Sequence, residues 1–87
     1  MPSLTYIDLF CGSGGASEGM RQAGLTHVCG VELNHTAALT YVANHDHVIE
    51  KSVCDVTRAD FDAYLQGRAL DVLIASPPCQ SFSRAGR

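Results

Sequence analysis

The chain has 87 residues, 46% of them hydrophobic and 17% charged, a composition typical of a folded domain rather than a disordered segment. Its formal net charge of −3 disfavours a self-sufficient nucleic-acid binder, because such proteins usually present a basic face to the phosphates. No apolar run approaches the roughly 18 residues of a membrane span, and the N-terminus does not read as a secretory signal. We therefore expect a cytoplasmic protein without a membrane partner.

The chain has four cysteines at wide and irregular spacings, which are Cys11, Cys29, Cys54 and Cys79. They include no C-x-x-C pair, and without a signal peptide this pattern favours reduced thiols over a disulfide framework. No ligand spacing joins them to His45 or His47, so we predict no metal site.

The first predicted element is a buried parallel strand over residues 4–10, an apolar run that leads into glycines. Asp8 interrupts this run and is expected to face a site or to cap the turn. The turn at 11–15 is rich in glycine, which lets backbone approach a ligand closely, and the helix start that follows favours negative charge. Ser17 replaces the third glycine of the dinucleotide fingerprint, which disfavours a nicotinamide-dependent oxidoreductase.

A helix over residues 16–23, ending at Gly24, and a second strand over 27–32 are predicted next. The residues on one face of this helix are Ala16, Met20 and Ala23. Glu32 lies 18 residues after Gly14, close to the spacing of about 20 at which an acid binds ribose hydroxyls in nucleotide-binding α/β folds. A solvated carboxylate explains Glu32 equally well on its own, but the neighbouring glycine turn favours ribose binding.

A second helix is predicted over residues 34–44, with Asn34 as its cap. Its buried face is expected to carry Ala38, Tyr41, Val42 and His45. His45 and His47 are interpreted as histidines of the surface or the core edge rather than as ligands, because no partner is evident. A short third strand is predicted at 47–50.

Residues 52–56 follow this strand, and Asp55 there suits either an ordinary turn or a hydrogen bond to an adenine amino group. Thr57 is predicted to cap a third helix that ends near Gln66, with Asp60 as the acid of a capping box. The residues of this helix expected to face the core are Phe61, Tyr64 and Leu65.

Residues 70–75 form the clearest strand of the sequence. Four strands thus alternate with three helices, which predicts an α/β fold with a parallel, doubly wound sheet. Pro77 and Pro78 stiffen the segment after the last strand and hold Cys79 just beyond its carboxyl end, where ligands of such sheets bind. An ordinary loop cysteine is the alternative, but stiffness and location favour a nucleophile.

Four segments resemble, in order and spacing, motifs of the DNA (cytosine-5) methyltransferases, and they cover nearly the whole chain. The segments are residues 8–15, 32–33, 55–56 and 77–83. The fourth is the most specific, whereas the first is shared by many methyltransferases. Cys11 stands where the family commonly has alanine, and Leu33 where it often has a large aromatic residue.

The resemblance implies a partial Rossmann-like methyltransferase sheet that binds S-adenosyl-L-methionine, with S-adenosyl-L-homocysteine as the product. Glu32 would bind the ribose hydroxyls, Leu33 would lie beside the adenine, and Asp55 would bind its amino group. The implied cofactor-binding residues are Phe10, Gly12, Ser13, Gly14, Gly15, Glu32, Leu33, Asp55, Val56 and Pro78. The implied substrate-binding residues are Gln80, Ser81, Ser83 and Arg84. Arg84 is equally compatible with a solvated charge.

Cys79 is implied as the catalytic nucleophile. Because C5 of cytosine is a weak nucleophile, a thiolate that adds to C6 would create an enamine able to take the methyl group. The target base would have to be flipped out of the duplex to reach the thiol. Cys79 and the glycine turn must then open onto the same crevice.

Residues 1–87 are expected to be the N-terminal portion of the catalytic domain, because the later family motifs and the target recognition region are not in this sequence. We expect this portion to be inactive alone and its fourth strand to be an exposed edge. Its expected partners are DNA that contains the target cytosine and the missing C-terminal half or a second subunit, with a nucleoid location if the protein is bacterial. An RNA (transfer RNA) cytosine-5 methyltransferase and a non-catalytic cofactor-binding or partner-binding module are the alternatives.

Overall fold

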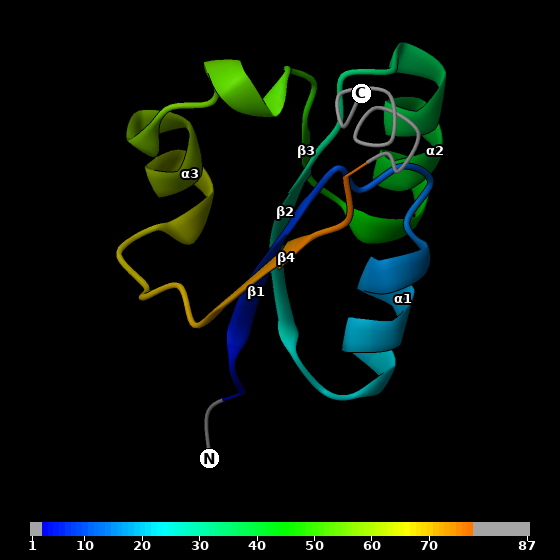
Figure 1. Ribbon diagram of the computed structural model, residues 1–87. Helices are drawn as coiled ribbons and strands as arrows, with labels where there is room; N and C mark the ends of the chain where they lie inside the picture. The colour runs from blue at the N-terminus through cyan, green and yellow to red at the C-terminus, as the bar shows by residue number, and fades with distance from the viewer. Residues whose placement is uncertain (1–2, 78–87) are drawn as a thin grey trace, which may run out of the picture.

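The computed structural model describes residues 3–77 and contains one parallel sheet of four strands (Figure 1). The strands are β1 (Thr5–Leu9), β2 (Thr26–Val31), β3 (Val48–Ile49) and β4 (Val72–Ala75). Their order is β3-β2-β1-β4, so the first strand of the chain lies inside the sheet. The predicted parallel α/β sheet is confirmed.

Helices cover both faces of the sheet (Figure 1). Two of them, α1 (Gly15–Gln22) and α2 (His35–His45), lie on one face. The short 3-10 helix η1 (Val53–Asp55) and α3 (Arg58–Leu65) lie on the other. This arrangement confirms the doubly wound topology, and it places the carboxyl ends of β1, β2 and β3 together at one edge.

Local signals fix the ends of the helices as predicted. The Asn34 side chain accepts a hydrogen bond of 2.9 Å from the Ala37 amide at the start of α2. Thr57 and Asp60 form a reciprocal capping box at the start of α3. Gly24 has a φ of 91°, which only glycine adopts without strain, just after α1 ends.

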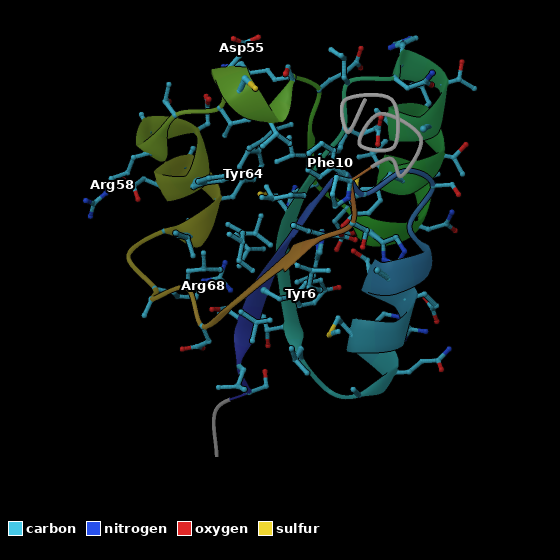
Figure 2. All side chains as sticks on the ribbon, in the orientation of Figure 1. Tyr6, Phe10, Asp55, Arg58, Tyr64 and Arg68 are labelled. Carbon is cyan, nitrogen blue, oxygen red and sulfur yellow. The ribbon has the colours of Figure 1, made fainter. Side chains whose placement is uncertain are left out.

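The alternation of β1 gives the two faces of the sheet different chemistry. Ile7 and Cys29 belong to an apolar cluster on the α3 face, which also contains Val28, Val31, Ile49 and Leu65. Tyr6 and Asp8 point to the α1–α2 face, where the Tyr6 hydroxyl donates to the Ser17 carbonyl. Figure 2 shows Tyr6 on the α1 side and Tyr64 on the α3 side. The predicted core face of α3 is confirmed, because Phe61, Tyr64 and Leu65 contact the apolar cluster.

The predicted core faces of α1 and α2 need correction. Ala16 and Ala23 are exposed and Met20 is half-buried, whereas Ser17 is completely buried. Ser17 is buried because α1 packs on polar groups of the sheet and of α2 rather than on an apolar layer. In α2, Ala38, Tyr41 and His45 are buried as predicted, but Val42 is exposed.

β4 lies at the edge of the sheet, hydrogen-bonded to β1 alone among the described strands. Leu73, at its centre, is 54% exposed on the α3 side. The expectation of an exposed fourth strand is therefore confirmed. β1 and β4 run in register, with Leu9 opposite Ala75, so both strands end at the same edge.

Candidate functional site

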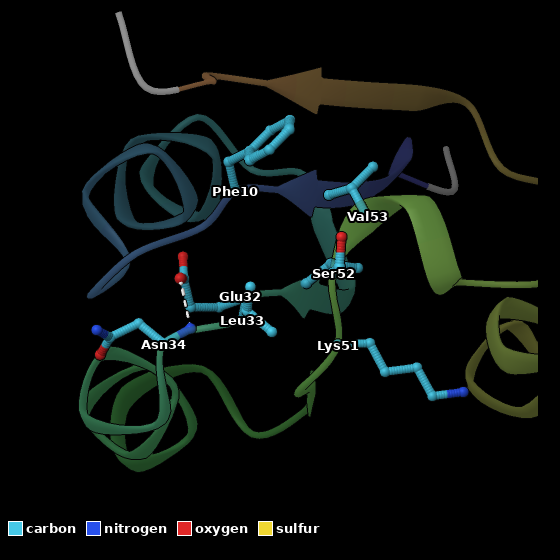
Figure 3. A pocket seen from close by; sticks show the side chains of 8 residues that line it. Phe10, Glu32, Leu33, Asn34, Lys51, Ser52 and Val53 are labelled. Carbon is cyan, nitrogen blue, oxygen red and sulfur yellow. Dashed lines mark hydrogen bonds between the residues drawn. The ribbon is translucent and has the colours of Figure 1, made fainter. Parts of the chain in front are cut away.

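A cavity of about 370 Å³ opens at the carboxyl ends of β1, β2 and β3 (Figure 3). This volume lies within the range of roughly 300–1,000 Å³ typical of small-ligand sites. The residues that line it are Phe10, Val31, Glu32, Leu33, Asn34, Lys51, Ser52 and Val53. Its walls are thus mostly apolar, with one carboxylate, which suits a ligand that has a flat apolar part and hydroxyl groups.

Glu32 connects the two loops that flank the cavity. One carboxylate oxygen accepts a hydrogen bond of 2.8 Å from the Gly12 amide, and the other accepts one of 2.9 Å from the Asn34 amide. Each oxygen keeps a second lone pair that can accept a bond from a ligand hydroxyl. The carboxylate is therefore held in place by the backbone and remains able to bind a ligand.

Phe10 contributes an aromatic ring to the cavity wall (Figure 3). Its φ of 56° is in the left-handed region, which costs a non-glycine residue roughly 1–2 kcal/mol. Phe10 is 37% exposed, so part of this residue stays open to solvent at the cavity. Backbone strain at a cavity wall is a feature of ligand sites.

The glycine turn packs tightly on α2. A Cβ atom built at Gly14 would lie 2.7 Å from two atoms of the His45 ring, and the φ of Gly14 is 108°. Gly12 also has a positive φ, of 55°, but its Cα faces open space. The turn thus needs glycine at position 14 for both space and conformation. At position 12 glycine only avoids the cost of a left-handed φ, which Phe10 bears at almost the same angle.

A second, more open hollow of about 700 Å³ lies where α1 begins and α2 ends. Its lining residues are Ser13, Gly14, Gly15, Glu18, Arg21, Asn44 and His45. Three of the predicted cofactor-binding residues therefore border this second hollow, whereas Phe10, Glu32 and Leu33 line the first. The Gly12 amide joins the two regions through its bond to Glu32.

The third predicted motif lies near the first cavity but does not line it. Asp55 is exposed at the end of η1 and projects from its outer side (Figure 2), and Val56 packs against the apolar cluster. The wall at this point is made by Lys51, Ser52 and Val53, which sequence reasoning missed. The only signal for them was their position just after the third strand.

The described thiols differ in exposure. Burial raises the pKa of both Cys11 and Cys29 to about 12, and for Cys11 the charges of Asp8 and Glu32 add to this effect. Both remain protonated near neutral pH and are unsuited to be nucleophiles. Cys54 is exposed on η1. The three described cysteines are free thiols, as expected.

The remaining predicted site residues lie outside the described part of the chain. These are Pro78, Cys79, Gln80, Ser81, Ser83 and Arg84. Pro77 is the last described residue, and it follows β4 at the edge where β1 ends. Within residues 3–77, no group of three or more side chains could hold a metal ion, and no helix is long and apolar enough to cross a membrane.

Sequence comparisons relate almost the whole chain to known methyltransferases. The family described as C-5 cytosine-specific DNA methylase matches residues 4–87. Type II methyltransferase M1.HphI of Haemophilus parahaemolyticus is 41% identical over 87 residues, which are 98% of this chain and 23% of that enzyme. Type II methyltransferase M.HgiGI of Herpetosiphon aurantiacus is 39% identical over 97% of this chain and 66% of its own length. The chain thus spans only part of each relative.

Solved structures show the same fold. A putative DNA modification methyltransferase encoded within an E. coli prophage superposes with a TM-score of 0.78 at 31% identity, over 90% of this chain and 23% of that one. The S. pombe Dnmt2 methyltransferase gives a TM-score of 0.68 at 28% identity, over 88% of this chain and 24% of its own. With a family match over 4–87 and this shared fold, the chain belongs to the C-5 cytosine-specific DNA methylase family.

Proposed function

We propose that residues 1–87 are the N-terminal portion of the catalytic domain of a DNA (cytosine-5) methyltransferase that uses S-adenosylmethionine. The observation that carries this proposal is the Glu32 carboxylate, fixed at the ligand-sized cavity by the amides of Gly12 and Asn34. Family membership gives this site its chemistry. Since the chain spans 23% of M1.HphI, we assign target recognition to the part of such an enzyme that lies outside these residues.

The residues of the first cavity fit an adenosyl group. Glu32 offers free lone pairs to ribose hydroxyls, and Phe10 and Leu33 offer apolar surface to the base. S-adenosylmethionine supplies a methyl group on a sulfonium centre when it is bound. We assign the turn residues Gly12, Ser13, Gly14 and Gly15 to the rest of the cofactor, together with Val56 and Pro78. We also propose a contact from Asp55, which requires its side chain to turn from the outer side of η1 toward the cavity.

The nucleophile of the proposed reaction is Cys79. Its thiolate would add to C6 of cytosine, and the resulting enamine would take the methyl group at C5 as the bond from that methyl group to the sulfonium sulfur breaks and S-adenosylhomocysteine leaves. A base, which can be water, would then accept the C5 proton, and the C5–C6 double bond would re-form as the S–C6 bond breaks and the Cys79 thiolate leaves. The shared end of β1 and β4 supports this role, since it starts the segment after Pro77 beside the glycine turn. Cys11 and Cys29 are buried, so neither offers an alternative thiolate.

The proposed substrate is DNA in which the target cytosine is flipped toward Cys79. We assign Gln80, Ser81, Ser83 and Arg84 to contacts with this base or the adjacent backbone. The net charge of −3 means that most of the phosphate contacts must come from elsewhere in the enzyme. Residues 1–87 alone are therefore expected to be inactive.

Covalent trapping tests this function in the full-length protein. DNA that contains 5-fluorocytosine cannot lose a proton from C5, so the enzyme should remain attached to it in the presence of S-adenosylmethionine. Cys79→Ser should abolish the adduct, whereas Cys54→Ser, which removes an exposed thiol on η1, should leave it unchanged. Absence of an adduct with the wild-type protein, or its survival in Cys79→Ser, would reject the mechanism.

A further inference from the structure

A buried chain of polar side chains runs beneath the glycine turn on the α1–α2 face. Ser17 Oγ lies 2.7 Å from Asp8 Oδ2 and 2.5 Å from the Tyr41 hydroxyl. The Tyr41 hydroxyl lies 2.8 Å from His27 Nε2. Asp8, Ser17 and Tyr41 are all completely buried. The chain therefore joins β1, α1 and α2 through completely buried side chains, and it reaches β2 at the partly buried His27.

The number of available protons gives this chain a direction. Ser17 donates its only hydroxyl proton to Asp8, so its oxygen must accept from Tyr41. Burial raises the pKa of Tyr41, so the hydroxyl retains its one proton, which it gives to Ser17. The Tyr41 oxygen must then accept from His27, which requires the proton on Nε2.

Ser17 is held at further points. Its carbonyl accepts a hydrogen bond of 3.1 Å from the Tyr6 hydroxyl. The Tyr41 ring fills space left by two glycines, since a Cβ at Gly30 would lie 2.5 Å from it and a Cβ at Gly14 would lie 3.2 Å from it. Ser17 is in the first turn of α1, whose start at Gly14 has no side-chain cap. The contacts of Ser17 thus fix the start of α1, as a capping side chain does in other helices.

We propose that Ser17 is a positioning residue for the cofactor turn, held by a hydrogen-bond chain that runs one way from His27 through Tyr41 and Ser17 to Asp8. This inference rests on the proposed function, because it assigns the turn at 12–15 to the cofactor. The chain orients the first turn of α1, and with it the amides between Gly12 and Gly15. Asp8 depends strongly on the hydrogen bond from Ser17, because its other carboxylate oxygen is buried without a partner among the described residues.

Two variants remove one hydroxyl each and keep the remaining shape, namely Ser17→Ala and Tyr41→Phe. Each hydroxyl makes two hydrogen bonds in the chain. Each variant should therefore weaken binding of S-adenosylhomocysteine to the full-length protein by at least about fivefold, which corresponds to about 1 kcal/mol. Tyr64→Phe is the matched control, because Tyr64 lies on the α3 face beside His47. It should change binding less than twofold.

The ring nitrogens of His27 give a second readout, which reports the direction of the hydrogen-bond chain independently of cofactor binding. Nitrogen-15 NMR of the wild-type protein should show the Nε2–H tautomer. In Ser17→Ala the Tyr41 hydroxyl loses its acceptor and should donate to His27 Nε2 instead. The Nδ1–H tautomer of His27 should then replace the Nε2–H tautomer. Tyr64→Phe should leave the tautomer unchanged.

The outcomes separate this inference from the proposed function. Wild-type affinity in both Ser17→Ala and Tyr41→Phe would overturn the positioning role, and an Nδ1–H tautomer in the wild-type protein would overturn the direction of the chain. A wild-type protein that fails to bind S-adenosylhomocysteine would instead overturn the proposed function, and with it the link to the cofactor. The NMR measurement would still decide the direction of the chain in that case.

Discussion

The two faces of the sheet are built by the same strands but held by different forces. On the α3 face, alternate residues such as Ile7 and Val31 form an apolar cluster. On the α1–α2 face, the residues between them, such as Asp8, meet hydroxyl groups and aromatic rings. Apolar contact tolerates small shifts, whereas a hydrogen-bond chain fixes distances to a few tenths of an ångström. The face next to the glycine turn is therefore built to hold side chains in position, and the opposite face to stabilise the fold.

The largest expected effect comes from the apolar face. Ile7→Ala removes a completely buried side chain and should lower the free energy of unfolding by about 3 kcal/mol. Leu39→Ala, at a position 56% exposed on α2, should cost less than about 0.5 kcal/mol. Urea denaturation of the full-length protein measures both. Equal costs for the two variants would show that the apolar cluster is not the main source of stability.

The next effect tests the turn. Gly14→Ala places a methyl group against the His45 ring at a φ of 108°, so we expect a loss of about 2 kcal/mol in stability and at least a tenfold loss of S-adenosylhomocysteine affinity. Gly19→Ala is the control, because Gly19 lies within α1 and a Cβ there meets open space. It should stabilise the protein by roughly 0.5–1 kcal/mol. A harmless Gly14→Ala would contradict the close packing of the turn on α2.

Acid should weaken the polar face through His27. Burial, and after it the nearby His45 and His47, lower the pKa of His27 to about 4 from an ordinary value of 6.5. As the pH falls from 6.5 to 4, His27 therefore binds a proton in the unfolded chain but stays neutral in the folded chain. The free energy of unfolding falls over this interval. We expect a loss of about 2 kcal/mol, less than the full shift implies because His27 is only partly buried.

His27→Gln isolates this contribution. Burial raises the pKa of Asp8, so Asp8 acts in the opposite sense and favours the folded state as the pH falls. Both proteins keep Asp8, and the difference between their unfolding curves at pH 7 and pH 4.5 reports on His27. The variant should lose clearly less stability than the wild type over this interval. Parallel losses would contradict a neutral, partly buried His27.

The smallest effect concerns the cap of α3. Thr57→Ala breaks the capping box with Asp60 and should cost about 1 kcal/mol of stability. Because α3 packs on the face away from the glycine turn, the affinity for S-adenosylhomocysteine should stay within twofold of the wild type. Thermal unfolding and calorimetry measure the two quantities. A large loss of affinity would show that the two faces are less independent than the comparison implies.

Local signals explain what could be predicted from the sequence. Asn34 and Thr57 begin their helices through contacts within a few residues, and Gly24 follows the end of α1, so their roles were correctly predicted. The burial of Ser17 could not be predicted, because it depends on Asp8 and Tyr41, which come from other elements. Asp8 was expected to face a site or to cap the turn, but it lies beneath α1, away from the ligand cavity. This position depends on α1 and α2 as well and could not be predicted either.

The candidate site was predicted in part for similar reasons. Glu32 follows a strand of clear pattern, and the structure places it in the lining of the cavity, whereas ribose binding by Glu32 stays a prediction. Lys51, Ser52 and Val53 were missed, because the wall they form depends on β3 ending after only two residues. Spacing alone therefore located the acid but not the opposite wall. The roles of the site residues, including Cys79, stay predictions.

Calorimetry of S-adenosylhomocysteine binding to the full-length protein and its Glu32→Gln variant tests whether the Glu32 carboxylate binds the cofactor. Glutamine keeps the size of the side chain but loses the charge, and one of its two ends becomes a donor. We predict that the wild type binds and that the variant binds at least tenfold more weakly. Its unfolding midpoint should also fall by a few degrees, because either the Gly12 or the Asn34 amide loses its acceptor. Equal affinity of the two proteins would contradict a cofactor site at this cavity.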